Sequence, residues 1–106
     1  MVSREQARQL ALALPEAAEQ DDHGRPSYRV GGKIFATQWD EQHLNVMLDE
    51  GGILTAVQSD PEAFEEVWWG KRRAAVRVDL GRVDAETLRD LLTDAWETKA
   101  PKRLVR

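Results

Sequence analysis

The chain has 106 residues, the size of one domain, and a single hydrophobic core of that size can sustain folding without disulfides or metals. With 42% hydrophobic and 32% charged residues it is a globular rather than a disordered chain, and no apolar run approaches the ~20 residues of a membrane span. The absence of cysteine excludes a zinc–thiolate site, and the net charge of −4 argues against binding DNA through overall charge.

The first predicted element is a helix over residues 3–14. Ser3 and Gln6 match a capping box, and Pro15 ends the helix because the residue before a proline avoids the helical region. The apolar positions between them recur at the spacing of one buried face. Residues 16–22 contain four carboxylates and are predicted to form a solvated connector.

A β-hairpin is predicted over residues 27–39, where Gly31-Gly32 forms a two-residue turn between runs of β-forming residues. This turn pairs Val30 with Lys33 and Tyr28 with Phe35, and paired residues share a face. The residues predicted to face the core are Tyr28, Val30, Phe35 and Trp39. Those predicted to face the opposite side are Arg29, Ile34, Ala36 and Gln38.

The next predicted strand covers residues 43–48, with Leu44, Val46 and Leu48 inward and His43, Asn45 and Met47 outward. A short helix over residues 51–58 and a turn through Phe64 follow.

Strands over residues 67–69 and 74–80 come next, the second with Val76, Val78 and Leu80 inward. Asp84 caps a last helix that ends before Pro101. Its apolar stripe consists of Leu88, Leu91, Leu92, Ala95 and Trp96. The expected product is an α+β two-layer sandwich, with helices on one face of a mostly antiparallel sheet and the other face open.

Several short motifs occur in a characteristic order. They are GRPSYRVGGKIFA at residues 24–36, Trp69-Gly70-Lys71, Arg77-Val78-Asp79-Leu80, Ala95-Trp96 and Ala100-Pro101-Lys102-Arg103-Leu104. In this order the chain resembles the MmcQ/YjbR family of small bacterial proteins over nearly its whole length. The resemblance implies one YjbR-like domain over residues 1–106, built as helix, three strands, helix, two strands, helix. This arrangement is sometimes called a double-wing DNA-binding domain.

Positive charge is concentrated in two hairpins and the C-terminal tail. Residues 23–39 carry three basic groups and no acidic one, residues 67–82 carry five against one, and residues 99–106 carry four against none. If these segments project together, a local positive field coexists with the negative total. The opposite interpretation is that the cations pair with acidic neighbours. The candidate nucleic-acid contacts are Arg25, Arg29, Lys33, Lys71, Arg72, Arg73, Arg77, Lys102 and Arg103, with Trp69 as a stacking surface for an unpaired base.

No constellation of residues indicates catalysis or metal binding. His23 and His43 lack ligand spacing, and neither Ser3 nor Ser27 lies in a nucleophile elbow. Trp39 and Trp96 are predicted to lie in the core. Of the consecutive Trp68 and Trp69, one must face away from it, and we expect this to be Trp69. We therefore expect a protein that is not an enzyme and has no cofactor or metal.

The leading prediction is a non-enzymatic DNA- or nucleic-acid-binding domain that contacts phosphates through two basic β-hairpin wings. The alternative is a protein- or peptide-interaction module that uses the open sheet face around Ile34, Ala36 and Met47. The fold that the resemblance implies is akin to that of secretion chaperones, which is an argument by fold analogy. The N-terminus lacks the hydrophobic region of a signal peptide, so we expect a cytoplasmic protein without membrane contact.

Overall fold

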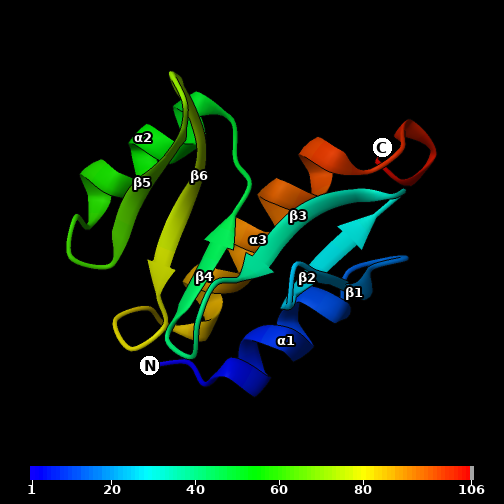
Figure 1. The fold of residues 1–106 in the computed structure, drawn as a ribbon, viewed down its shortest axis with the longest axis horizontal. Coiled ribbons are helices and arrows are strands. Elements are labelled where there is room, and N and C mark those ends of the chain that lie inside the picture. Colours follow the sequence, from blue (N-terminus) through cyan, green and yellow to red (C-terminus); the bar gives the residue numbers. More distant parts are fainter. Residues whose placement is uncertain (106) are drawn as a thin grey trace.

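The computed structural model describes residues 1–105 as one six-stranded antiparallel sheet with three helices on one of its faces (Figure 1). The strand order is β1-β2-β3-β4-β6-β5. The elements are α1 (Arg4–Leu12), β1 (Ala18–Asp22), β2 (Arg25–Val30), β3 (Lys33–Gln38), β4 (His43–Val46), α2 (Glu50–Ser59), β5 (Phe64–Trp69), β6 (Arg72–Asp79), α3 (Ala85–Lys99) and the 3-10 turn η1 (Lys102–Leu104). The predicted α+β two-layer architecture is confirmed, with one strand more than expected.

The additional strand is β1, in the segment predicted to be a connector. It pairs antiparallel with β2, from Ala18 opposite Arg29 to Asp22 opposite Arg25. His23 and Gly24 form the turn between the two strands, both at positive φ, as primed hairpin turns require. The prediction was wrong because the side chains of β1 are mostly exposed and acidic, so no apolar alternation marks the strand. Backbone pairing with β2 decides its conformation.

The helices begin and pack as their sequence patterns predict. In α1 the Ser3 hydroxyl accepts from the Gln6 amide N–H, and the Gln6 side chain accepts from the Ser3 N–H, which completes the capping box. Asp84 caps α3 by accepting from the Thr87 N–H at 2.7 Å. The apolar stripe of α3 is buried except for Leu91, which is partly buried, and the indole N–H of Trp96 donates to the Pro15 carbonyl at 2.9 Å. This bond fixes α3 against the segment that follows α1.

A β-bulge in β3 changes the face of the residues that follow it. Val30 pairs with Lys33 as predicted, and Arg29 pairs with Ile34, but Tyr28 pairs with Ala36. Phe35 is therefore the extra residue of the bulge, and the predicted pairing of Tyr28 with Phe35 is wrong. Phe35 and Ala36 are both fully buried in the core. An insertion of one residue reverses the alternation beyond it.

Because the alternation is reversed beyond the bulge, three more predictions of side-chain direction are wrong. Ala36 and Gln38 point to the core side rather than outward, and both are buried. Trp39, predicted to lie in the core, instead lies on the open face of the sheet and is 37% exposed. Thr37 reaches the open face as well. In β4 there is no bulge, and the predicted inward positions Leu44 and Val46 are fully buried.

Ionisation of Tyr28, the single tyrosine of the chain, reports directly on the packing of the core. It is only 1% exposed, and burial, followed by the nearby Glu19 carboxylate, raises its pKa to about 12. Because the unfolded value is about 10, the folded state holds this proton longer than the unfolded state does. The resulting stabilisation is fully present below pH ~10 and is lost as pH rises through about 12, by an amount on the order of 2–3 kcal/mol.

We expect near-ultraviolet absorbance to show tyrosinate forming at a midpoint near pH ~12 in the native protein and near ~10 in concentrated urea. Since the chain has no second tyrosine, the signal needs no assignment. Equal midpoints in both solvents would contradict the burial of this hydroxyl.

Candidate nucleic-acid interface

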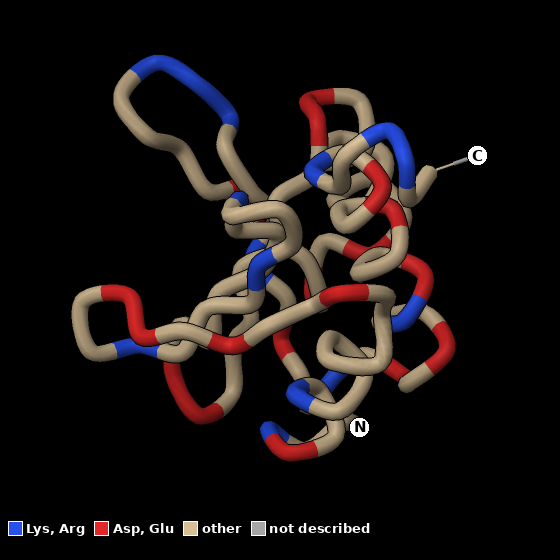
Figure 2. Tube along the Cα trace, turned by 90° about the vertical axis from the view of Figure 1, so that its right-hand side faces the viewer, with Lys and Arg blue, Asp and Glu red and all other residues tan. Residues whose placement is uncertain are grey.

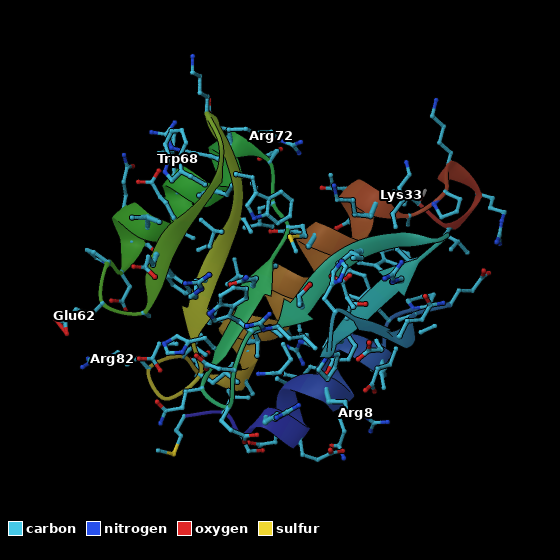
Figure 3. The ribbon with its side chains drawn as sticks, viewed as in Figure 1. Arg8, Lys33, Glu62, Trp68, Arg72 and Arg82 are labelled. Atoms are coloured by element: carbon cyan, nitrogen blue, oxygen red, sulfur yellow. The ribbon has the colours of Figure 1, made fainter. Side chains whose placement is uncertain are left out.

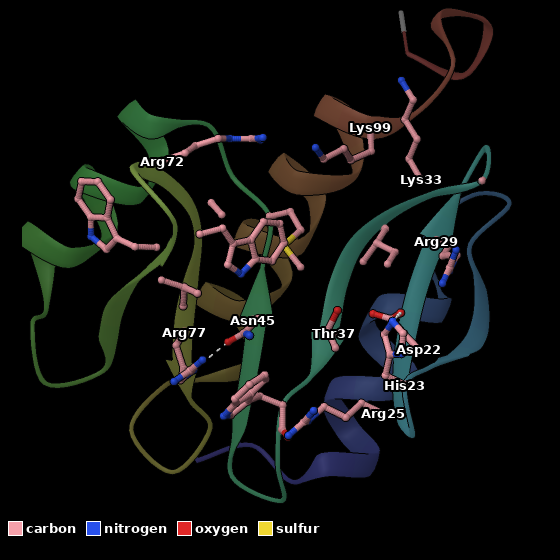
Figure 4. A pocket seen from close by; sticks show the side chains of 18 residues that line it. Asp22, His23, Arg25, Arg29, Lys33, Thr37, Asn45, Arg72, Arg77 and Lys99 are labelled. Carbon is pink, nitrogen blue, oxygen red and sulfur yellow. Dashed lines mark hydrogen bonds and ion pairs between the residues drawn. The ribbon is translucent and has the colours of Figure 1, made fainter.

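The open face of the sheet holds a groove with a volume of about 740 Å³ (Figure 4). Counting residues 1–105, six cations and one carboxylate, Asp22, line it. The cations come from three strands and the end of a helix: Arg25 and Arg29 of β2, Lys33 of β3, Arg72 and Arg77 of β6, and Lys99 of α3. The groove is therefore positive although the protein as a whole is negative.

At one end of the groove, cations of the β2–β3 and β5–β6 hairpins face the end of α3 (Figure 4). Arg72 and Lys99 extend toward one another there, and Lys33 lies beside Lys99 (Figure 4). Within residues 1–105, no carboxylate oxygen lies within 4.0 Å of a charged nitrogen of these three residues. Their charges are thus available to a ligand.

The floor of the groove contains part of a polar row that crosses all six strands. Strand pairing places its members side by side in the order Gln20, Ser27, Thr37, Asn45, Arg77 and Glu65. Next to this row lies a small apolar cluster of Ile34, Met47, Val67 and Ala75. The floor thus offers hydrogen-bonding groups and an apolar surface within one groove.

Trp39 is held between two arginines. The guanidinium carbons of Arg25 and Arg77 lie 4.1 and 4.4 Å from the centre of its ring, and two guanidiniums cannot share one face at these distances. Arg25 Nε also donates to the Trp39 carbonyl at 2.9 Å, and Arg77 Nε donates to Asn45 Oδ1 at 3.0 Å. Both faces of this indole are therefore occupied, and Trp39 positions the two arginines.

Trp68 and Trp69 lie at the rim and differ in what covers them. Arg73 lies over the Trp68 ring at 4.7 Å, and Trp68 faces the side of the β5–β6 hairpin that is nearer to α2 (Figure 3). Trp69 is 57% exposed, and no cation of residues 1–105 lies over its ring. The predicted position of Trp69 outside the core is confirmed, although Trp68 is also exposed, at 47%.

The groove gathers six of the ten predicted contact residues and leaves four outside it. Those in the groove are Arg25, Arg29, Lys33, Trp69, Arg72 and Arg77; those outside are Lys71, Arg73, Lys102 and Arg103. Of the latter, Lys71 and Arg73 belong to the projecting β5–β6 hairpin, whose run of cations is seen in Figure 2, and Lys102 and Arg103 belong to η1. The strand alternation turns Arg72 and Arg73 to opposite sides.

Two of the excluded cations are neutralised by carboxylates, as the opposite interpretation of the charges predicts. Arg73 donates to Glu66 and, at 3.0 Å, to Glu50 of α2, and these two hydrogen bonds raise its pKa. Arg103 makes two hydrogen bonds of 2.8 Å with Glu16, which hold the pKa of Glu16 below its usual value. These arginines connect elements of the fold.

The sequence analysis missed Trp39, Lys99, Thr37 and Asn45 as residues of the groove. The outward position of Asn45 was predicted, but nothing marked it as part of a site. Lys99 was counted in the basic tail, yet the end of α3, rather than Lys102 or Arg103, brings positive charge to the groove. Trp39 and Thr37 depend on the bulge at Phe35, for which the sequence carries no signal.

The described part of the chain offers neither a metal-binding cluster nor a helix that could span a membrane. Residues 1–105 contain no cluster of three His, Cys, Asp or Glu side chains placed to hold a metal ion. His43 instead pairs with Asp40, its Nδ1 lying 2.9 Å from Oδ1. None of the helices in these residues is long and apolar enough to cross a bilayer.

Fold and site together define a small α+β domain with a cationic, tryptophan-rimmed groove on its open sheet face. The YjbR family model matches residues 12–98, and the chain belongs to the YjbR family, as its motifs predict. The chain is similar in fold to the crystal structure of the Deinococcus radiodurans protein DR2400, which has a DUF419 domain. The TM-score is 0.76 at 22% identity, with 92% of this chain and 78% of that chain covered. No curated protein shows significant similarity to the chain.

Proposed function

We propose that this YjbR domain binds single-stranded nucleic acid in the groove on its open sheet face. Sites for single strands combine a positive groove that follows the backbone with aromatic side chains on which bases stack. The observation that carries the proposal is the convergence of Lys33, Arg72 and Lys99, unpaired within residues 1–105, with the exposed ring of Trp69. In this arrangement the cations contact phosphates and Trp69 stacks on a base.

A single strand suits the groove better than a duplex does. The floor residues Thr37 and Asn45 are 8% and 4% exposed, so only a base freed from its pair can reach them. Arg73 and Arg103, which would extend a duplex contact along the second wing and the C-terminal tail, are engaged by carboxylates. The net charge of −4 further opposes tight duplex binding.

Fluorescence anisotropy with labelled octamers tests this function directly. We expect the single strand to bind at about 20 mM salt more tightly than a duplex of the same sequence. If three phosphates are contacted, a tenfold rise in salt lowers the affinity by about 100-fold. Absence of single-strand binding at the lower salt concentration would overturn the proposal.

The two neighbouring tryptophans provide a matched pair for the stacking step. Replacing Trp69 by alanine is expected to weaken binding about tenfold, because stacking on one base contributes about 1–3 kcal/mol. Replacing Trp68 is expected to change binding less than about twofold, since Arg73 covers its ring. Equal losses in the two variants would show that the octamer does not stack on Trp69 in particular.

Protein or peptide binding through the sheet face stays a second prediction. The exposed apolar surface that would support it is smaller than expected. Of the three apolar residues expected there, Ala36 is fully buried and Met47 is 7% exposed. The exposed apolar surface comes instead from the tryptophans. A peptide ligand would lose its binding on Met47→Lys and would depend little on Arg72, whereas an oligonucleotide would depend strongly on Arg72.

A further inference from the structure

We infer that Thr37 and Asn45 read the edge of one unpaired base and select a base rich in carbonyl groups, uracil or thymine. This inference rests on the proposed function and adds a specificity to it. The two residues form a cross-strand pair between β3 and β4, at the centre of the polar row on the groove floor. Trp39 and Met47 follow them by two positions, just beyond the ends of β3 and β4, and line the same groove.

Both side chains are more than nine-tenths buried yet have unused hydrogen-bonding groups. The exposed fraction is 8% for Thr37 and 4% for Asn45. Within residues 1–105, neither the Thr37 hydroxyl nor Asn45 Nδ2 has a side-chain hydrogen bond, and neither atom is sealed from solvent. Buried polar groups are usually paired, so groups left open on the floor of a groove are suited to a ligand.

The neighbouring arginine fixes the direction of the Asn45 amide. Arg77 Nε can only donate, so the amide oxygen must face it, and the 3.0 Å bond between them is drawn in Figure 4. Nδ2 therefore points away from Arg77 and presents its two hydrogens to the groove. Arg77 is in turn held by its contact with Trp39. The orientation of the donor is thus set before any ligand binds.

The floor consequently contains more donors than acceptors. Asn45 offers two N–H donors, Arg77 offers further guanidinium N–H groups, and the Thr37 hydroxyl both donates and accepts. A uracil or thymine edge presents two carbonyl oxygens that flank one N–H, which matches this supply. Cytosine presents an amino group in place of one carbonyl, and that group would face donors. Since Asn45 Oδ1 is engaged, the two-bond contact of asparagine with adenine is also disfavoured.

Octamers of deoxyuridine and deoxycytidine isolate this effect, because they have the same charge, length and ring size. We expect the wild type to bind the uridine octamer about fivefold more tightly, the worth of one net hydrogen bond. Asn45→Asp keeps the acceptor for Arg77 and replaces the donor by an acceptor. It should weaken both complexes through its charge and reverse the preference toward cytidine. Thr37→Val should bring the ratio of affinities close to one.

Gln20→Glu is the matched control, since it adds the same charge at the exposed outer end of the polar row. It should preserve the ratio while weakening both complexes slightly. Equal binding of the two octamers by the wild type, or an unchanged ratio in both Asn45→Asp and Thr37→Val, overturns the inference and leaves the proposed function standing. Failure of the wild type to bind either octamer overturns both. Circular dichroism tests whether each variant is folded. If Asn45→Asp does not fold, the ratio of affinities measured with Thr37→Val decides between the two outcomes.

Discussion

The double variant Arg72→Glu with Lys99→Glu is expected to bind a single-stranded octamer about 100-fold more weakly than the wild type at low salt. The two side chains extend toward one another across one end of the groove, and within residues 1–105 no carboxylate neutralises either of them. Each substitution removes a phosphate contact and places a negative charge at the same position. The plot of log affinity against log salt should become shallower by about 1.4, the share of two contacts on a single strand.

A control with the same change in net charge separates the groove from a general field effect. Arg82 and Arg89 lie outside the groove, and both are exposed. When both double variants are compared at 0.1 M salt, replacing these two arginines by glutamate should weaken binding only a few-fold, because exposed charges separated by more than about 10 Å are largely screened there. If this control loses as much affinity as the groove variant, the octamer responds to total charge and the groove is not its site. Arg82 pairs with Glu62 and Asp79 at the surface, so circular dichroism should show that the control stays folded. Arg73→Glu is unsuitable here, since it breaks the contacts that join β6 to Glu66 of β5 and Glu50 of α2.

Phe35→Ala is expected to lower the free energy of unfolding by about 3–5 kcal/mol, the usual cost of removing a large buried aromatic ring. Phe35 is fully buried, and the bulge that it forms places it in the core together with the adjacent Ala36. A loss of this size is a large share of the stability of a domain of this length. Urea unfolding followed by tryptophan fluorescence measures it.

Ile34→Ala is the matched control on the same strand. Ile34 is partly exposed on the open face, where it contacts the small apolar cluster of the groove, so its loss should cost less than about 2 kcal/mol. Similar costs for the two substitutions would show that Phe35 does not lie in the main core. Such a result would also contradict the presence of the bulge, which turns Thr37 and Trp39 toward the groove.

Local patterns predicted the regular parts of this fold well. The capping box at Ser3, the cap at Asp84 and the stripe of α3 are short-range features, and the side chains that create them are adjacent on one helix. The alternation in β4 was likewise sufficient to place Asn45 and Met47 outward. Motif order led to the YjbR family, which the family model confirms.

Features that depend on pairing between strands were not predictable in this way. The edge strand β1 has no apolar alternation and exists because β2 supplies its hydrogen bonds. The bulge at Phe35 leaves no signal in composition, yet it decides the direction of every later side chain in β3.

The amino-acid order was enough to establish the elements, the family and which segments carry positive charge, because each of these follows from neighbours along the chain. It did not establish which cations share a surface. Arg72 and Arg73 are adjacent in sequence, but one lines the groove and the other binds Glu66, because successive residues of a strand face opposite sides. Lys99 joins Arg72 only because α3 packs across the sheet and ends at the rim of the groove. The site is a product of distant segments meeting in three dimensions.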